Sequence, residues 1–158
     1  MRAVVQRVSE AMVETGGAAV GACEKGFLIL LGVHRDDTEE DAVLLTEKIC
    51  KLRVFSDENG KMNRSVTDVG GGVLVVSNFT LYANTAGGNR PDFLEAAAPE
   101  RANYLYRFFI EKMRGRVEQV GEGVFGADMT VRLINDGPVT IILDSENLKK
   151  HKGSTKNA

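Results

Sequence analysis

The sequence has few of the residues from which cross-linked or metal-binding sites are built. Its 158 residues include two cysteines and two histidines. Cys23 and Cys50 lie far apart, with no Cys-x-x-Cys pair and no histidine near them in the sequence. This spacing indicates neither a disulfide framework nor a zinc site. We therefore expect two buried free thiols, and neither a metal ion nor a cofactor.

Long apolar runs and an excess of positive charge are also missing. No apolar stretch approaches the roughly 20 residues that a membrane-spanning helix needs, and the N-terminus has no charged and apolar leader, so we expect a cytoplasmic protein that avoids membranes. The formal net charge is -2, whereas domains that coat nucleic acid through its phosphates carry a clear basic excess. A nucleic-acid partner that is contacted only at one end agrees with this charge.

The composition predicts one soluble domain. A chain of this length can bury roughly two-thirds of its unfolded surface in a single core. Its 43% of hydrophobic and 27% of charged residues are ordinary for a globular protein. We expect the domain to cover residues 1–145, followed by a flexible basic tail over residues 146–158.

Apolar periodicity predicts the elements of this domain. Strands are expected at residues 2–8, 12–15, 18–20, 27–33, 73–76, 127–134 and 139–143. A helix is expected over residues 38–52, where Thr38 and Asp41 give a capping signal, and another from Pro99 to near Gly115. The order of these elements favours an α/β fold, with mixed, largely antiparallel sheets forming a partly closed barrel and two main helices packed on it.

Two polar motifs interrupt the apolar pattern. The first, Asn135-Asp136-Gly137-Pro138-Val139-Thr140, separates two apolar runs. Its Pro138 removes a backbone donor and restricts Gly137, so we expect a turn that is too rigid for an ordinary hairpin. The second, Ser77-Asn78-Phe79-Thr80-Leu81-Tyr82, directly follows the buried strand Val73-Leu74-Val75-Val76. Three hydrogen-bonding side chains therefore stand where a strand leaves the core.

Ser77 and Thr80 are three residues apart, so in a straight strand they would point to opposite faces. They can share a site only if the chain bends at Asn78-Phe79. Such a bend, or a single helical turn, would also expose consecutive backbone N–H groups, which are suited to an oxyanion hole. Taken alone, this spacing is more often that of a capping serine and a half-buried strand threonine.

The sequence offers no conventional base for ester hydrolysis. His34 follows a buried strand in a polar loop, and His151 lies in the tail. The Gly-x-Ser-x-Gly motif of a nucleophilic serine is absent. An ester hydrolase built from this chain would therefore depend on backbone dipoles, hydroxyl groups and a group of its substrate.

The two motifs closely resemble the pair that marks the D-aminoacyl-tRNA deacylases, Ser-Gln-x-x-Thr and Asn-x-Gly-Pro-x-Thr, although Thr80 follows Ser77 by three residues and not by four. Asn78 stands where that family usually has Gln, which is one methylene longer. The resemblance ends near Ser145, and it extends over Met1-Arg2-Ala3-Val4-Val5-Gln6-Arg7-Val8, Leu52-Arg53-Val54-Phe55, Gly88-Asn89-Arg90-Pro91-Asp92-Phe93 and Phe125-Gly126-Ala127-Asp128-Met129.

This resemblance implies hydrolysis of the ester bond of D-aminoacyl-tRNA, and of glycyl-tRNA, as a chirality proofreading step in translation. The substrate would be bound by its terminal adenosine. The resemblance also implies a homodimer, in which a cis Gly137-Pro138 turn enters the partner subunit's site. The implied catalytic residues are Ser77, Asn78, Phe79 and Thr80, the substrate-binding residues are Gly137, Pro138, Phe125 and Met129, and the supporting residues are Arg7, Asn135 and Thr140.

Two other interpretations of the function stay open. One is a related deacylase that acts on mischarged L-aminoacyl-tRNA and is associated with a trans Gly-Pro turn. The other is a non-catalytic RNA-binding domain, for which the basic tail is the only support. For a deacylase, either Thr80 or the ribose 2′-hydroxyl could drive the chemistry. We expect the 2′-hydroxyl to do so, because no histidine is placed to activate the threonine.

Overall fold

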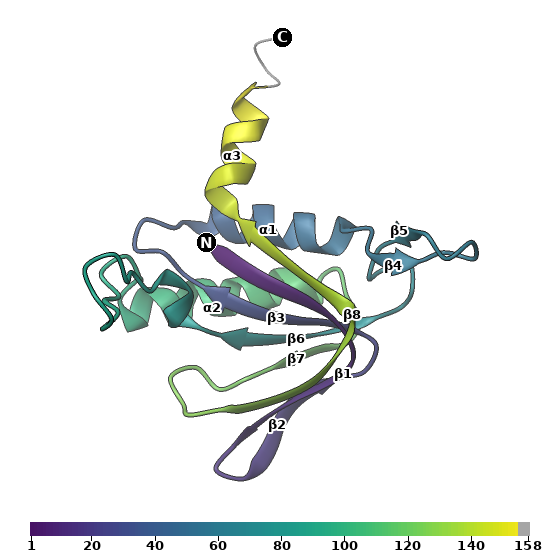
Figure 1. The fold of residues 1–158 in the computed structure, drawn as a ribbon, viewed down its shortest axis with the longest axis horizontal. Helices are drawn as coiled ribbons and strands as arrows, with labels where there is room; N and C mark the ends of the chain where they lie inside the picture. The colour runs from purple at the N-terminus through teal and green to yellow at the C-terminus, as the bar shows by residue number, and fades with distance from the viewer. Residues whose placement is uncertain (155–158) are drawn as a thin grey trace.

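The sheet is built around its longest strand, β1 (Arg2–Thr15), in a computed structural model that describes residues 1–154, with side chains as far as His151 (Figure 1). This strand pairs antiparallel with three others. Residues 2–8 pair with β3 (Gly26–Gly32), residues 11–15 pair with β2 (Ala18–Cys23), and both halves pair with β8 (Thr130–Asp144). Because its two halves have different partners, β1 links the two ends of a strongly bent sheet.

The remaining strands continue the sheet in parallel. β3 pairs with β6 (Gly72–Ser77), and β6 pairs with β7 (Val120–Glu122), which gives the order β2-β1-β3-β6-β7. The end strands β2 and β7 approach closely, because a Cβ atom on Gly21 would lie 2.3 Å from the carbonyl oxygen of Glu122. The sheet is therefore a nearly closed barrel of mixed strands, which confirms the expected fold class.

Two helices cover the outside of this barrel, and both were predicted. α1 (Glu39–Lys51) begins after Thr38, whose backbone N–H donates a hydrogen bond to Oδ2 of Asp41 at 2.9 Å. α2 (Pro99–Arg114) begins with a proline, as its sequence indicates. A small hairpin of β4 (Phe55–Ser56) and β5 (Met62–Arg64) stands outside the main sheet.

The strands β3 and β6 are buried on both faces. On one face, side chains such as Ile29 and Val75 pack against α1 and α2. On the other face, Leu28 and Leu74 fill the barrel interior together with Val13 of β1. This double burial explains why these two strands are uninterrupted apolar runs in the sequence.

The Asn135–Thr140 segment differs from the expected turn between two strands. Asn135 pairs with Val8 and Thr140 pairs with Gln6, so four residues of β8 stand opposite Arg7 alone. Both apolar runs belong to one strand, and the segment between them is a wide bulge. The strand also begins at Thr130 and not at residue 127.

The first part of the segment expected to be a flexible tail, from residue 146, forms the helix α3 (Ser145–Ser154). The buried Ser145 accepts a hydrogen bond from the Met1 amino group at 2.7 Å and donates one to Asp41 at 2.6 Å. Lys149 also bonds to Asp41, at 2.9 Å. These contacts hold the start of α3 on α1, whereas Lys156 lies outside the described residues.

None of the helices within residues 1–154 is both long and apolar enough to cross a bilayer.

Candidate active site

The motif Ser77–Thr80 lies where β6 ends and the chain turns into η1 (Phe79–Tyr82), a single 3-10 turn. The N–H of Asn78 donates to the carbonyl oxygen of Leu31 at 2.8 Å, which keeps Asn78 on the end of β3. The first hydrogen bond of the turn runs from the N–H of Leu81 to the carbonyl oxygen of Asn78 at 3.3 Å. The N–H groups of Phe79 and Thr80 precede this bond and stand at the open end of the turn. The chain therefore bends at Asn78-Phe79, which is the condition under which Ser77 and Thr80 could share a site.

A cavity of about 510 Å³ opens beside this turn, and its walls are mostly apolar. Ser77, Asn78 and Phe79 form one side. Thr80 is not a lining residue; it is exposed, and its hydroxyl group bonds to the side chain of the lining residue Asn78. The other lining residues are Leu31, Val33, Phe93, Ala96, Ala97, Pro99, Ala102, Tyr106, Phe125, Gly126, Ala127, Asp128 and Met129. A volume of this size suits a small ligand that is oriented by a few polar groups.

The loop that follows β7 supplies the wall with Phe125 and Met129. Its position is fixed by Gly123, whose N–H donates to the carbonyl oxygen of Val75 at 3.0 Å. A Cβ atom on Gly123 would lie 2.7 Å from the sulfur of Met129, so the glycine leaves room for that side chain. Farther along the loop, the hydroxyl of Thr15 donates to the carbonyl oxygen of Asp128 at 3.0 Å. Phe125 and Met129 thus lie in the cavity wall, beside the predicted Ser77 to Phe79 segment.

Tyr106 of α2 is a lining residue that the sequence did not single out. Its buried hydroxyl donates to the carbonyl oxygen of Val75 at 2.9 Å, and its ring lies 5.9 Å from that of Phe125. Burial raises the pKa of Tyr106 to about 12, so the hydroxyl stays neutral and keeps its donor proton. This residue joins α2 to the end of β6. Only its place on the apolar face of α2 could have indicated that it is buried.

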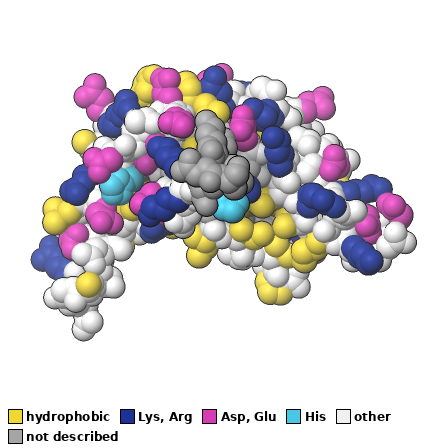
Figure 2. Space-filling view, turned by 90° about the horizontal axis from the view of Figure 1, so that it is seen from above, with side chains coloured by type: hydrophobic (Ala, Val, Ile, Leu, Met, Phe, Trp, Pro, Cys, Tyr) yellow, Lys and Arg dark blue, Asp and Glu magenta, His cyan; other side chains and the backbone are white. Residues whose placement is uncertain are grey.

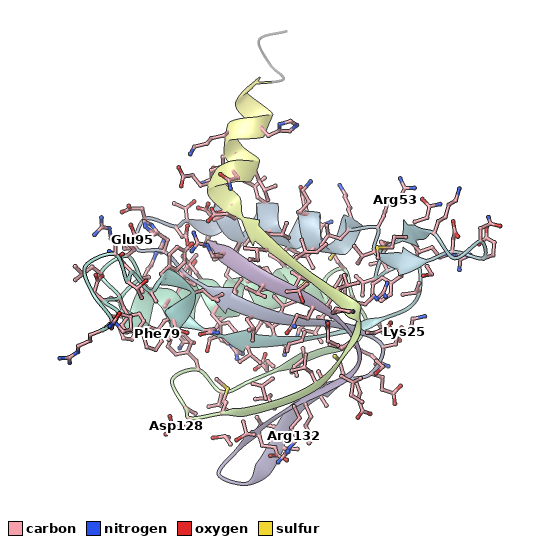
Figure 3. All side chains as sticks on the ribbon, viewed as in Figure 1. Lys25, Arg53, Phe79, Glu95, Asp128 and Arg132 are labelled. Carbon is pink, nitrogen blue, oxygen red and sulfur yellow. The ribbon has the colours of Figure 1, made fainter. Side chains whose placement is uncertain are left out.

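An aromatic pair stands at the mouth of the cavity. The ring of Phe79 is 57% exposed and meets the ring of Phe93 edge to face, with 4.9 Å between the centroids. Phe93 ends the Gly88–Phe93 stretch that supported the family resemblance, but no role was predicted for it. In Figure 3, Phe79 and Asp128, which both line this cavity, lie toward the same end of the sheet.

Arg7 of β1 holds the bulge of β8 in place through contacts with Asp136. Its Nε donates to the carbonyl oxygen of Asp136 at 2.9 Å and lies 3.3 Å from the carboxylate of the same residue. Another guanidinium nitrogen donates to the carbonyl oxygen of Val54. Arg7 is only 9% exposed, so these contacts satisfy a charge that has little access to water.

The side chain of Asn135 links the two ends of the bulge to each other and to β1. Its side-chain amide donates to the carbonyl oxygens of Arg7 at 3.1 Å and Val139 at 3.0 Å. The peptide between Gly137 and Pro138 is cis, and both residues are exposed. Thr140 is also exposed, and its hydroxyl accepts a weak hydrogen bond from Gln6 at 3.3 Å.

Within one chain, the bulge and the cavity are far apart. Ser77 pairs with Leu31, which pairs with Ala3 of β1, whereas Asn135 pairs with Val8. Positions 3 and 8 of one strand are separated by about 17 Å. Val8 also pairs with Gly26, the first residue of β3. In Figure 3, Lys25, which precedes Gly26, and Phe79 lie toward opposite ends of the sheet. In the described part of the chain, neither Gly137 nor Pro138 lines the cavity.

The chemistry of the site also depends on which side chains could bind a metal ion or act as a base. Among the described residues, no group of three or more His, Cys, Asp or Glu side chains is placed to hold a metal ion. His34 lies outside the cavity lining, where its Nδ1 accepts a hydrogen bond from the N–H of Asp36 at 3.2 Å. The polar groups beside the cavity that can act on a ligand are therefore hydroxyls, amides, backbone dipoles and the carboxylate of Asp128.

Comparison with known proteins shows what this arrangement is similar to. The D-aminoacyl-tRNA deacylase of Thermus aquaticus is 57% identical over 145 residues, which cover 92% of this chain and 95% of the relative. A solved structure named c-Myc DNA unwinding element binding protein is 44% identical, with a TM-score of 0.86 over 91% of this chain and 98% of the other.

A second solved structure, of a probable eukaryotic D-amino acid tRNA deacylase, has a TM-score of 0.76 at 16% identity, over 90% of this chain and 98% of the other. At that identity the likeness shows a common fold alone. The family model for D-Tyr-tRNA(Tyr) deacylase matches residues 4–144. The matched segment includes the cavity, the 3-10 turn and the bulge of β8, and the chain therefore belongs to the D-Tyr-tRNA(Tyr) deacylase family.

Proposed function

We propose that this protein hydrolyses the ester bond of D-aminoacyl-tRNA and of glycyl-tRNA, and thereby removes wrongly charged tRNA in the cytoplasm before it is used in translation. The observation that carries the proposal is the cavity beside the open end of η1, in a chain whose relative at 57% identity is named D-aminoacyl-tRNA deacylase. The cavity holds the aminoacyl group and the adjoining ribose. The remainder of the tRNA stays outside, which agrees with a net charge of -2.

The reaction follows from the groups that surround the cavity. A water molecule attacks the ester carbonyl carbon, and the negative charge on the carbonyl oxygen is stabilised by the N–H groups of Phe79 and Thr80. One such donor contributes about 3 kcal/mol to stabilisation of a transition state. The bond from the carbonyl carbon to the ribose 3′-oxygen breaks, and the ribose 2′-hydroxyl passes the proton of the water to that oxygen. Because an aminoacyl ester is already activated, orientation and these dipoles suffice without a histidine base.

We further propose that the site is completed by a second copy of the chain. Each copy places its exposed Gly137-Pro138 segment in the partner's cavity, where the two carbonyl oxygens accept hydrogen bonds from the α-ammonium group. A two-fold axis would form two such sites at once. Arg7 and Asn135 act as supports, because they bind the backbone on either side of this segment.

The outer surface of β8 supports this assembly. The strand pairs only with β1 in the described part of the chain, so its second edge has no strand partner. Apolar side chains are exposed along it, with Ile134 at 54% and Ile142 at 70%. A free edge that carries exposed apolar residues is suited to burial by another protein surface.

Chirality would be read at the Cα atom. A site that accepts many D-amino acids does not read the side chain, so it must distinguish the positions of hydrogen and side chain relative to the ammonium and ester groups. If the partner's Gly137 and Pro138 bind the ammonium group, an L side chain points into this backbone and is excluded. Glycine has no side chain to exclude, which is why glycyl-tRNA is also a substrate.

Two other functions give different outcomes in the same experiment. The name of the 44% identical relative refers to DNA, which favours nucleic-acid binding without hydrolysis as a second candidate. However, Figure 2 shows basic and acidic side chains intermixed on the face that carries α3, and not a continuous basic surface. A deacylase for mischarged L-aminoacyl-tRNA is the third candidate.

The test is a deacylation assay with purified protein on D-tyrosyl-tRNA, L-tyrosyl-tRNA and glycyl-tRNA. We expect rapid release of D-tyrosine, slower release of glycine, and L-tyrosine release at the rate of the uncatalysed control. Similar rates on both tyrosyl esters would contradict the chirality mechanism. Binding of tRNA with every ester left intact would instead support the non-catalytic candidate.

A further inference from the structure

The hydroxyl group of Thr80 is not free, because it donates a hydrogen bond to the side-chain oxygen of Asn78. Asn78 is half-buried, and its backbone is fixed on both sides by bonds to Leu31 and Leu81. Thr80 is exposed and lies two residues beyond Asn78, which lines the cavity. An anchored amide therefore sets the direction of an otherwise mobile hydroxyl group.

The bond to Asn78 determines whether the Thr80 hydroxyl can donate or accept a hydrogen bond toward a ligand. A hydroxyl group has one proton to donate and two lone pairs that accept. Because the proton is directed at Asn78, only the lone pairs of the oxygen are available to a ligand. An amide oxygen is also too weak a base to deprotonate the hydroxyl, so the pair does not form an activated nucleophile.

We propose that Asn78 is a positioning residue, which holds the Thr80 hydroxyl as a hydrogen-bond acceptor for the aminoacylated ribose. The group that it receives is a polar N–H or O–H of the substrate, either the α-ammonium or the 2′-hydroxyl. Both neighbour the scissile ester and both need an acceptor when they enter an apolar cavity. This inference depends on the proposed deacylase function and adds a role for one pair of side chains in it.

The length of the asparagine side chain suits this role. Asparagine commonly accepts hydrogen bonds from groups two residues farther along the chain, because its amide oxygen lies close to its own backbone. Here it bonds to the side chain of residue i+2. The amide of glutamine, which the family usually has at this position, stands one methylene farther from the backbone. In this chain the shorter amide of Asn78 makes the bond to Thr80.

The first experiment is a double-mutant cycle in the full-length protein, assayed on D-tyrosyl-tRNA. Asn78→Ala and Thr80→Val should each lower kcat about tenfold, with KM changed less than about twofold, because each removes one oriented hydrogen bond. The double variant should be no slower than Thr80→Val alone. Multiplied losses in the double variant would show that the two residues act independently and would overturn the proposal.

The direction of the hydrogen bond is tested by Asn78→Asp. A carboxylate accepts but does not donate, so this variant should recover most of the kcat that Asn78→Ala loses. If Asn78 instead donated to Thr80, Asn78→Asp would be as slow as Asn78→Ala. Asn63→Ala is the matched control, because that amide donates to Asp57 at 3.3 Å on the distant β4–β5 hairpin. Its kcat should equal that of the wild type.

Two altered substrates identify the group that Thr80 receives. One is the desamino analogue 3-(4-hydroxyphenyl)propionyl-tRNA, which has no α-nitrogen and therefore no N–H donor there, and the other is D-tyrosyl-tRNA ending in 2′-deoxyadenosine. Both proteins are compared in single turnover at high enzyme concentration, because loss of the 2′-hydroxyl also removes the proposed proton carrier and slows the wild type. The ratio of wild-type to Thr80→Val rates should fall to about one on whichever substrate lacks the donor. An undiminished tenfold ratio on both would refute the inference. These results are distinguishable from failure of the proposed function, in which the wild type would leave unmodified D-tyrosyl-tRNA intact.

Discussion

Arg7 of β1 reaches across the sheet to the carbonyl oxygen of Asp136, 2.9 Å away, in the residue that precedes Gly137-Pro138. A lysine at this position keeps the charge but cannot span Asp136 and Val54 with one planar group. We expect Arg7→Lys to lower deacylation at least tenfold while the far-ultraviolet circular dichroism stays unchanged. Arg53→Lys, at an exposed arginine whose Nε donates to the carbonyl oxygen of Asn63, should keep wild-type activity.

Gly137 cannot carry a side chain without moving its neighbours. Its φ is 148°, and a Cβ atom would lie 2.5 Å from the backbone nitrogen of Val139. We predict that Gly137→Ala lowers the free energy of unfolding by about 1–3 kcal/mol and removes most of the activity. Gly87→Ala, where a Cβ atom would meet nothing within 4 Å, is the control for urea unfolding and should match the wild type. Full activity of Gly137→Ala would exclude a close fit of this segment in the partner's cavity.

The free edge of β8 gives a prediction about assembly. Ile142 is 70% exposed, and Ile142→Asp would place a charge in the proposed interface. We expect sedimentation to show a dimer for the wild type and a monomer for this variant, with activity lost in proportion to the monomer. Met62→Asp, at a residue that is 56% exposed on the β4–β5 hairpin, should leave both properties unchanged. A fully active monomer would contradict the shared site.

The contact between α3 and α1 predicts a dependence of stability on pH. Burial acts to raise the pKa of Asp41, but hydrogen bonds from Ser145 and Lys149 outweigh it and lower the pKa below the ordinary value of 3.8. A lowered pKa in the folded state stabilises the protein above the unfolded pKa, and this contribution is lost as the pH falls.

Removal of the Lys149 amino group tests this linkage. Lys149→Met should lower the free energy of unfolding by about 1–2 kcal/mol at pH 7, and the difference from the wild type should shrink below about pH 4. Lys150→Met is the control, since Lys150 pairs with Glu146 on an exposed surface, where such pairs contribute little. A difference that stayed constant from pH 7 to pH 3 would contradict the assigned role of Asp41.

Local patterns in the sequence predicted the parts of the site that depend on neighbouring residues. The polar residues that follow Val76 marked the place where the strand leaves the core, but their spacing gave the bend only as one of two possibilities. Thr38 and Asp41 indicated the start of α1. In both cases the contacts that fix the structure lie within a few residues.

The features that the sequence did not reveal depend on distant contacts. β8 stays one strand across its bulge because Arg7 and Asn135 bind the bulged backbone, and no local signal reports a partner more than 100 residues away. β7 has only three residues, too few for a periodic pattern. α3 is held through Ser145 and Asp41, whose pairing is equally non-local.

The pairing of β1 with β8 also has a consequence for synthesis of the protein. Arg2 pairs with Asp144, so a strand made at the start of translation finds one of its partners only when that last strand has emerged from the ribosome. Contacts of such high sequence separation slow folding and leave apolar strands uncovered in the meantime. The strands β2, β1, β3, β6 and β7 can pair before β8 emerges, but the second edge of β1 stays without its β8 partner until then, and chaperones have that interval in which to act.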